Sequence, residues 1–409
     1  MKRTELHGQI HWVLSCLIAF FISFKFLIPV FIVLLLINWV AEGNFKSKFK
    51  SIPNLPVFLV FISLYLYYLI GMLYSSNKTY GWADLQTKLS LLIFPLIFAT
   101  SLVNKEKFNS VLLSFVSGVF AVSLYLLARA SYLYFHENIN YFYYVDFSYF
   151  LHPSYFGMFV NLAMLIIGLD KIEFLAKNNF IKIAALLFLL FIIILLSSKL
   201  ALLSTLLLML IYGISYIVKT KKFKLGLALL FTFVAATILL IKAVPELNAR
   251  IQNALNAVNA DEVDKTESES NAVRILVWNA AGKALVENGL IGTGTGDVKD
   301  ELFKQYEKLG YTGALEHKLN AHNQFLQTGV ALGYIGLLVL LATFFVPIYF
   351  SWLNKNYLFI CFSLLVLLNC LTESMLEAEA GVIFISFFQS ILFFNEVKFT
   401  PTKFSTFAE

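Results

Sequence analysis

Residues 320–336 read NAHNQFLQTGVALGYIG, so a histidine and an asparagine stand at the mouth of a segment that is otherwise strongly hydrophobic. The apolar run continues to about residue 350, which predicts a membrane-spanning helix over 323–350. Similar runs recur along the chain: of 409 residues, 59% are hydrophobic and 14% charged, and mean hydropathy is +0.77. The alternation typical of barrel strands is absent. The sequence therefore predicts an all-α, polytopic membrane helical bundle.

The hydrophobic segments predict about twelve transmembrane helices. We expect them at 10–24, 26–41, 54–74, 87–102, 109–133, 153–169, 181–197, 200–218, 225–243, 323–350, 357–371 and 380–395. This pattern divides the chain into three parts. Residues 1–243 hold the first nine spans, residues 244–322 form one large loop, and residues 323–409 hold the last three spans and a tail.

Lysine and arginine are distributed unevenly between the predicted loops. With a cytoplasmic N-terminus, seventeen of them lie on the cytoplasmic side: Lys2, Arg3, Lys46, Lys48, Lys50, Lys105, Lys107, Lys171, Lys177, Lys182, Lys219, Lys221, Lys222, Lys224, Lys355, Lys398 and Lys403. The short outer loops and membrane ends hold four: Lys25, Lys78, Lys88 and Lys199. Cytoplasmic loops are enriched in these residues. We therefore expect both termini in the cytoplasm, the large loop in the periplasm, and a net charge of +6 that reflects topology, not a nucleic-acid partner.

The large outer loop contains its own helical pattern. The stretch NAVRILVWNAAGKALVENG, 271–289, places Val273, Leu276, Val277 and Ala280 at helical spacing. GTGTGD follows at 292–297, and a second, polar helix reaches about Leu309. The glycines match neither a dinucleotide fingerprint nor a Walker motif, so we interpret them as a turn after a helix. A small helical cap over the bundle is the simplest prediction.

Three cations lie on the outer side against the general trend. Arg129 ends the fifth span, Lys199 stands in SSKLAL between the seventh and eighth spans, and Arg274 begins the loop helix. Arg129 and Lys199 have an ordinary alternative, in which they extend to the interface or pair with Glu373, Glu377 or Glu379. Taken together, the three cations favour a site for an anion, and the anion natural to a membrane is a lipid phosphate or pyrophosphate.

His322 has two interpretations. A histidine before a span is commonly an interfacial anchor. However, Asn323 follows it, the loop that carries Arg274 ends there, and glycines in the span behind allow close helix approach. A neutral imidazole at this point can accept a proton from an attacking hydroxyl while cations stabilise a departing phosphate. The six histidines show no spacing typical of metal ligands, so we expect no metal.

The stretch HNQFLQTGVALGYIG has the pattern His-Asn, nine residues, Gly, two residues, Gly, and it resembles the signature of the O-antigen ligase and polymerase family. Arg274-x-x-x-Trp278 in one large outer loop is similar to that family as well. SSKLAL looks like the family's Ser-Arg-Gly element, with Lys199 in place of the usual arginine, which keeps the charge but loses the bidentate fork. HPSYFGM (152–158) and LTESMLEAEAGV (371–382) resemble segments of family members.

The resemblance implies a GT-C-like inner-membrane glycosyltransferase without cofactor. Such an enzyme moves a glycan from undecaprenyl pyrophosphate to an acceptor hydroxyl, such as that of lipid A-core, with inversion. Arg274, Lys199 and Arg129 would hold the pyrophosphate, and His322 would activate or orient the acceptor. Asn323 would support His322 or bind substrate, and Trp278 would offer a stacking face. The partners implied are the lipid-linked donor, the acceptor and membrane lipids.

Other functions fit parts of the same pattern. Within the family, an O-antigen polymerase or an O-linked oligosaccharyltransferase differs from a ligase only in its acceptor. A lipid-linked glycan flippase would use outer charges along a pathway, but transporters commonly show internal repeats and charges near mid-membrane. A membrane scaffold whose loop binds a partner would tolerate replacement of His322 and Arg274.

Overall fold

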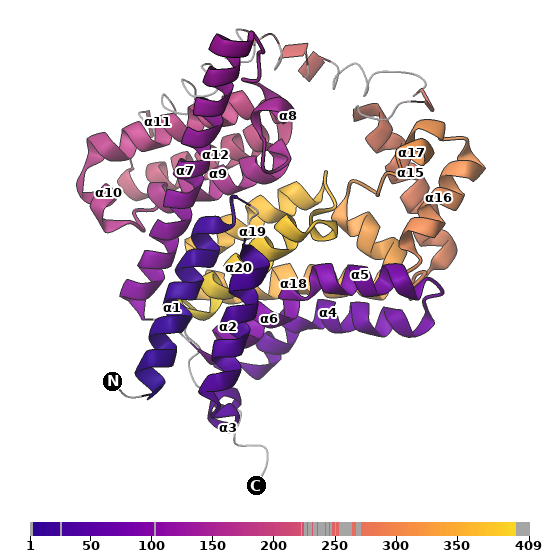
Figure 1. Cartoon of the computed structure of the whole chain (residues 1–409), viewed down its shortest axis with the longest axis horizontal. Coiled ribbons are helices and arrows are strands. Elements are labelled where there is room, and N and C mark those ends of the chain that lie inside the picture. The colour runs from indigo at the N-terminus through magenta and orange to yellow at the C-terminus, as the bar shows by residue number, and fades with distance from the viewer. Residues whose placement is uncertain are drawn as a thin grey trace.

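A computed structural model of the chain describes residues 3–24, 27–101, 104–221, 264–266 and 271–397, with isolated positions between 223 and 252. Every regular element in this part is a helix (Figure 1). The helices are α1 Arg3–Phe21, α2 Ile28–Glu42, α3 Phe45–Lys50, α4 Leu55–Tyr74, α5 Lys78–Lys88, α6 Ser90–Thr100, α7 Lys105–Glu137, α8 Tyr144–Phe147, α9 Pro153–Gly168, α10 Glu173–Lys177, α11 Asn179–Leu196, α12 Lys199–Thr220, α15 Asn271–Asn288, α16 Val298–Leu309, α17 Thr312–Glu316, α18 Gln324–Leu353, α19 Tyr357–Cys370, the 3-10 turn η1 Met375–Glu377 and α20 Glu379–Phe394.

The helices are those of a membrane protein. Within the described residues, five helical stretches are long and apolar enough to cross a bilayer: Leu55–Tyr74, Lys78–Thr100, Lys105–Glu137, Asn179–Leu196 and Gln324–Leu353. Shorter apolar helices accompany them, α9, α19 and α20 among them. Helices also coincide with the other expected spans, except for 225–243, which lies largely outside the described residues. The number of spans stays a prediction, whereas the all-helical membrane class is confirmed.

The core of the bundle is built around α20. Its sequence EAGVIFISFFQSILFF is apolar on every side, and such a helix has to be buried on all faces. Phe384 stacks on Phe159 of α9, with ring centroids 4.1 Å apart, and Phe388 meets Phe115 of α7 at 4.6 Å. α6 packs along α20 as well. The short turn η1, which precedes α20, is therefore attached to a helix that is buried along almost its whole length.

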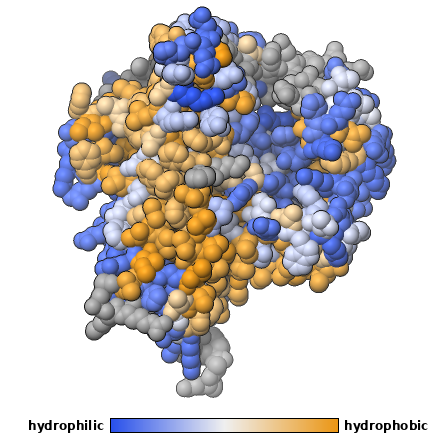
Figure 2. Space-filling model, viewed as in Figure 1, coloured by the Kyte–Doolittle hydropathy of each residue, from blue (hydrophilic) through white to orange (hydrophobic). Residues whose placement is uncertain are grey.

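A helical cap stands beside the bundle, as the sequence predicts. α15, α16 and α17 form it (Figure 1), and hydrophilic residues gather on the surface over these helices while apolar ones cover much of the bundle (Figure 2). Val273, Leu276, Val277 and Ala280 of α15 are buried, which confirms the predicted helix and its inner face. α16 ends at Leu309, as expected. α15 packs against α18 and thereby joins the cap to the bundle.

The expected continuous span over 323–350 is broken. Gly333, inside α18, has φ +68° and ψ −166°, which interrupts the helix. Residues 289–294 pass through the break, where the amides of Thr293 and Gly294 donate to the carbonyls of Val330 (3.0 Å) and Ala331 (2.8 Å). From the other half of the helix, the amide of Tyr334 donates to the Gly289 carbonyl at 3.2 Å. A break inside an apolar helix is tolerated because protein groups satisfy the exposed backbone in this way.

The glycine-rich segment is a turn after a helix, as predicted, and it binds the loop to α4 and α5. The carboxylate of Asp297 accepts from the backbone amides of Ser76 and Asn77, each at 2.6 Å. The hydroxyl of Thr295 donates to the carbonyl of Tyr68 at 2.6 Å. The large loop is therefore not only a cap, because its glycine-rich part packs between α4 and α18.

Lys88, one of the four cations that the sequence assigns to the outer side, is a buried ion-pair residue. Its side chain is fully buried and pairs with Asp84 and, at 2.9 Å, with Glu377. It also lies over the ring of Tyr68, 4.8 Å from the centroid. A buried charge is stable only when it is paired. Lys88 therefore ties α5 to the turn before α20.

Gly333→Ala should destabilise the fold by about 1–3 kcal/mol, because this backbone conformation is nearly restricted to glycine and a β-carbon would run into the carbonyl of Leu290. Thermal unfolding in detergent measures the effect. Gly168→Ala is the matched control, because a β-carbon there meets nothing within 4 Å and the residue ends an ordinary helix. Equal unfolding temperatures for the two variants would contradict the role of the break.

Candidate functional site

Glu373 is the centre of a cluster at the mouth of α18. It lies between α19 and α20, and its side chain is 10% exposed. One carboxylate oxygen accepts from the guanidinium of Arg274 at 2.6 Å, and the other contacts Nδ1 of His322 at 3.1 Å. Three segments far apart in sequence therefore meet at one carboxylate.

The environment of Glu373 keeps this carboxylate ionised. Burial alone would raise its pKa, but the hydrogen bond from His322 and the positive charge of Arg274 bring the pKa below its ordinary value. An ionised carboxylate can only accept hydrogen bonds. The contact with His322 therefore requires a proton on Nδ1, and a neutral imidazole then carries its lone pair on Nε2.

His322 stands in an unusual backbone conformation just before α18. Its φ is +42°, in the left-handed region, and its amide donates to the side chain of Asn320 at 2.9 Å. Its carbonyl accepts from the indole nitrogen of Trp278 at 3.2 Å. Trp278 lies one helical turn after Arg274 on α15, so this helix contacts both the backbone of His322 and its carboxylate partner.

Asn323 fixes the start of α18. Its side-chain oxygen accepts from the amides of Phe325 (2.9 Å) and Leu326 (3.1 Å), which makes it the N-cap. Its side-chain nitrogen donates to the carbonyl of Leu371 at 2.9 Å, and its backbone amide donates to the hydroxyl of Ser374 at 3.2 Å. The residue thus holds the mouth of α18 against the turn that carries Glu373.

The two other predicted cations are carried by other helices. Arg129, on α7, donates to the carbonyl of Asp146 at 2.9 Å and lies over the rings of Tyr149 (4.6 Å) and Tyr141 (5.3 Å). Lys199 begins α12, which packs against α9 and α19, and it is half-buried. The structure thus joins Arg274, Trp278, His322 and Asn323 directly, and their roles in binding stay predictions.

The residue that sequence reasoning missed is Glu373. The sequence suggests Glu373 only as an ion-pair partner for Arg129 or Lys199, whereas in the structure its partners are Arg274 and His322. The available signal was LTESMLEAEAGV, a short connection between two apolar segments that holds three glutamates. Which glutamate faces which cation depends on tertiary packing: Glu373 meets Arg274, Glu377 meets Lys88, and Glu379 is exposed.

The cluster has the parts of an acid–base site. A carboxylate that orients an imidazole leaves the opposite ring nitrogen as a proton acceptor, and a guanidinium beside it can bind an anion. Across the described ranges, no three histidine, cysteine, aspartate or glutamate side chains gather as a set of metal ligands.

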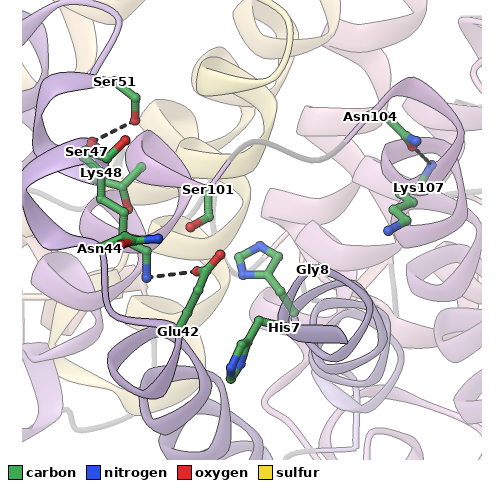
Figure 3. Close-up of a pocket in the computed structure, with 12 residues that line it drawn as sticks. His7, Gly8, Glu42, Asn44, Ser47, Lys48, Ser51, Ser101, Asn104 and Lys107 are labelled. Carbon is green, nitrogen blue, oxygen red and sulfur yellow. Dashed lines mark hydrogen bonds and ion pairs between the residues drawn. The ribbon is translucent and has the colours of Figure 1, made fainter. Parts of the chain in front are cut away.

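A separate polar cavity of about 510 Å³ lies where α1, the α2–α3 connection and the start of α7 meet. In Figure 3 the side chains of Lys48 and Glu42, 2.8 Å apart, meet on one side, and Lys107 stands on the opposite side. His7 and Asn104 also line it. None of these residues belongs to the cluster around Glu373.

Comparison with known proteins bears on the same region. Residues 184–341 match the family model described as O-antigen ligase, a range that contains Lys199, Arg274, Trp278, His322 and Asn323. Arg129 precedes the matched range and Glu373 follows it. No curated protein matches the chain. Over this region the chain is similar to the O-antigen ligase family, and the match supports a membrane enzyme of the ligase and polymerase type.

Proposed function

We propose that the protein transfers a glycan from undecaprenyl pyrophosphate to an acceptor hydroxyl, with lipid A-core as the acceptor, at the periplasmic face of the inner membrane. The observation that carries the proposal is the contact of one buried carboxylate, Glu373, with both Arg274 and His322. It combines an anion-binding group with an oriented proton acceptor. Both are needed when a hydroxyl displaces a pyrophosphate.

In the proposed reaction, the acceptor hydroxyl loses its proton to Nε2 of His322 as its oxygen attacks the anomeric carbon. The bond from that carbon to the pyrophosphate oxygen breaks, and the lipid pyrophosphate departs with the electron pair. Attack from the side opposite the leaving group inverts the anomeric centre. Arg274 stabilises the negative charge on the departing group, and a guanidinium, with five N–H groups in a planar fork, suits a phosphate well.

The remaining predicted residues have supporting parts in this proposal. Asn323 holds the mouth of α18 so that His322 keeps its position. Trp278 fixes the His322 carbonyl and offers the face of its ring to a sugar. Lys199 and Arg129 would bind the donor's phosphates from other helices, and Lys199 does so as a point charge.

A polymerase is the second candidate, because the same site would serve an acceptor hydroxyl on another lipid-linked glycan. The family model, which includes ligase- and polymerase-type enzymes, favours it over a transporter. An O-linked oligosaccharyltransferase differs from both only in using a protein hydroxyl.

His322→Ala should lower kcat for transfer by about 100- to 10,000-fold, the usual contribution of a positioned general base. Arg274→Ala should raise the KM for the donor and lower kcat, and Arg274→Lys should recover part of both, because it keeps the charge but not the fork. The assay uses purified protein in liposomes, undecaprenyl-pyrophosphate-linked glycan and lipid A-core, with products separated on a gel.

His317→Ala is the matched control, because that histidine is exposed at the end of α17. Growth of the lipid-linked glycan without transfer to lipid A-core would replace ligase by polymerase. Full transfer activity in the His322→Ala and Arg274→Ala variants, with folding intact, would contradict the proposed site.

Glu373→Gln should lower kcat and destabilise the protein by about 1–3 kcal/mol at neutral pH, because two hydrogen bonds lose their charge. The folded pKa of Glu373 lies below the ordinary 4.5, so its stabilisation is complete above pH 4.5 and is lost as the pH falls through the folded value. Thermal midpoints measured from about pH 7 to about pH 3 should therefore converge for wild type and Glu373→Gln. Glu379→Gln, at an exposed position, should have the same thermal midpoint as wild type at every pH. A difference in midpoint between wild type and Glu373→Gln that stays constant into acid would refute the ion cluster.

A further inference from the structure

An open groove of about 440 Å³ runs along the outer side of α15. Its lining is Trp278, Asn279, Gly282, Lys283, Val286 and Glu287. Trp278, Gly282 and Val286 follow one another at intervals of four residues, as do Asn279, Lys283 and Glu287, so each set forms a row along one side of the helix. Arg274 stands one turn before Trp278 in the first row. The groove therefore begins at the candidate site and leads away from it.

Gly282 is the residue that the fold does not explain. It lies inside α15, where glycine is the poorest helix former apart from proline. It has no positive φ, and a β-carbon built on it meets nothing within 4 Å. Neither backbone conformation nor close packing therefore calls for glycine here. What the missing side chain provides is open space beside the ring of Trp278.

The walls of the groove suit a chain of sugars. Trp278 is held by its bond to the His322 carbonyl, so the orientation of its ring is set. The Asn279 side chain already accepts from the hydroxyl of Tyr311 at 3.2 Å, and Glu287 accepts from Lys308 at 2.8 Å and from Gln305 at 2.6 Å. Lys283 adds an exposed donor. An aromatic face flanked by donors and acceptors fits a polyhydroxylated ligand, and the exposed charges disfavour an isoprenoid chain.

We propose that this groove binds the sugar units of the donor glycan that follow the reacting sugar. The proposal rests on the proposed function, in which Arg274 holds the donor pyrophosphate and the reacting sugar lies beside His322. The sugars beyond it then extend along α15, past Trp278 and over Gly282. The donor is thereby recognised as an extended glycan and not only as a lipid pyrophosphate.

The experiment narrows the groove without touching Trp278 or Arg274. Gly282→Ala and Gly282→Leu place side chains of increasing size into open space, so both variants should fold. The donor is isolated from the source cells with its full glycan, and part of it is trimmed by glycosidases to its first sugar. We expect Gly282→Leu to lower kcat/KM by about tenfold for the extended donor, with a smaller loss for the trimmed donor and for Gly282→Ala. Gly168→Leu, at another open helix position, is the control.

Equal losses for the two donors, or no loss for either, would overturn the groove as a donor subsite. So would a loss that follows the length of the acceptor glycan. Saturation-transfer NMR measures binding of the free glycan to wild type, Gly282→Leu and Gly168→Leu. This measurement tests glycan binding in the groove independently of the transfer reaction. If wild type transfers neither donor, the proposed function fails; glycan binding that only Gly282→Leu removes would still support the groove, and binding that it leaves intact would overturn it.

Discussion

The pairing of Glu373 with Arg274 and His322 is the contact on which the site depends. A buried carboxylate is costly unless its oxygens are paired, so the fold that buries Glu373 also has to bring both partners to it. Arg274 comes from the cap and His322 from the mouth of α18. The bond from the Asn323 amide to the Ser374 hydroxyl joins the same mouth to the same turn. The positions of the two candidate site residues, Arg274 and His322, are thus set by one charge within the bundle, although both residues belong to the loop.

That turn is held at its other end as well. Glu377, four residues after Glu373, pairs with the fully buried Lys88 of α5, and the amide of Leu376 donates to the Gln324 side chain at 2.6 Å. α5 is in turn tied to the cap, because Asp297 accepts from the amides that precede it. The contacts form a closed circuit from α15 through the turn to α5 and back. A movement of the cap would therefore have to break buried charged contacts, which favours a site that is formed before substrate binds.

Composition was sufficient to predict the class of the fold, because hydrophobic runs of bilayer length have few alternatives. Periodicity was sufficient for α15, whose buried row is visible in Val273 and Val277. It could not reveal the break at Gly333, since 323–350 is one apolar run and the break exists only where residues 289–294 enter from elsewhere. The candidate site likewise has one part that local sequence patterns predict and one part that depends on tertiary contacts. Motifs predict His322, Asn323, Arg274 and Trp278 as candidates, whereas the partner of each glutamate depends on contacts between segments that no spacing records.

The contact between His322 and Glu373 also limits where the acceptor can approach. Nδ1 faces the carboxylate, and Nε2 lies on the far side of a rigid ring, so on the proposed mechanism the attacking hydroxyl comes from the side away from Glu373. On the same proposal the donor would follow α15, which carries Arg274 and Trp278 on one face. Donor and acceptor would then be bound by different elements on either side of one imidazole. On this proposal, a related enzyme could change its acceptor by altering the surface near Nε2 without disturbing the helix that binds the donor, and a ligase and a polymerase would need no separate chemistry.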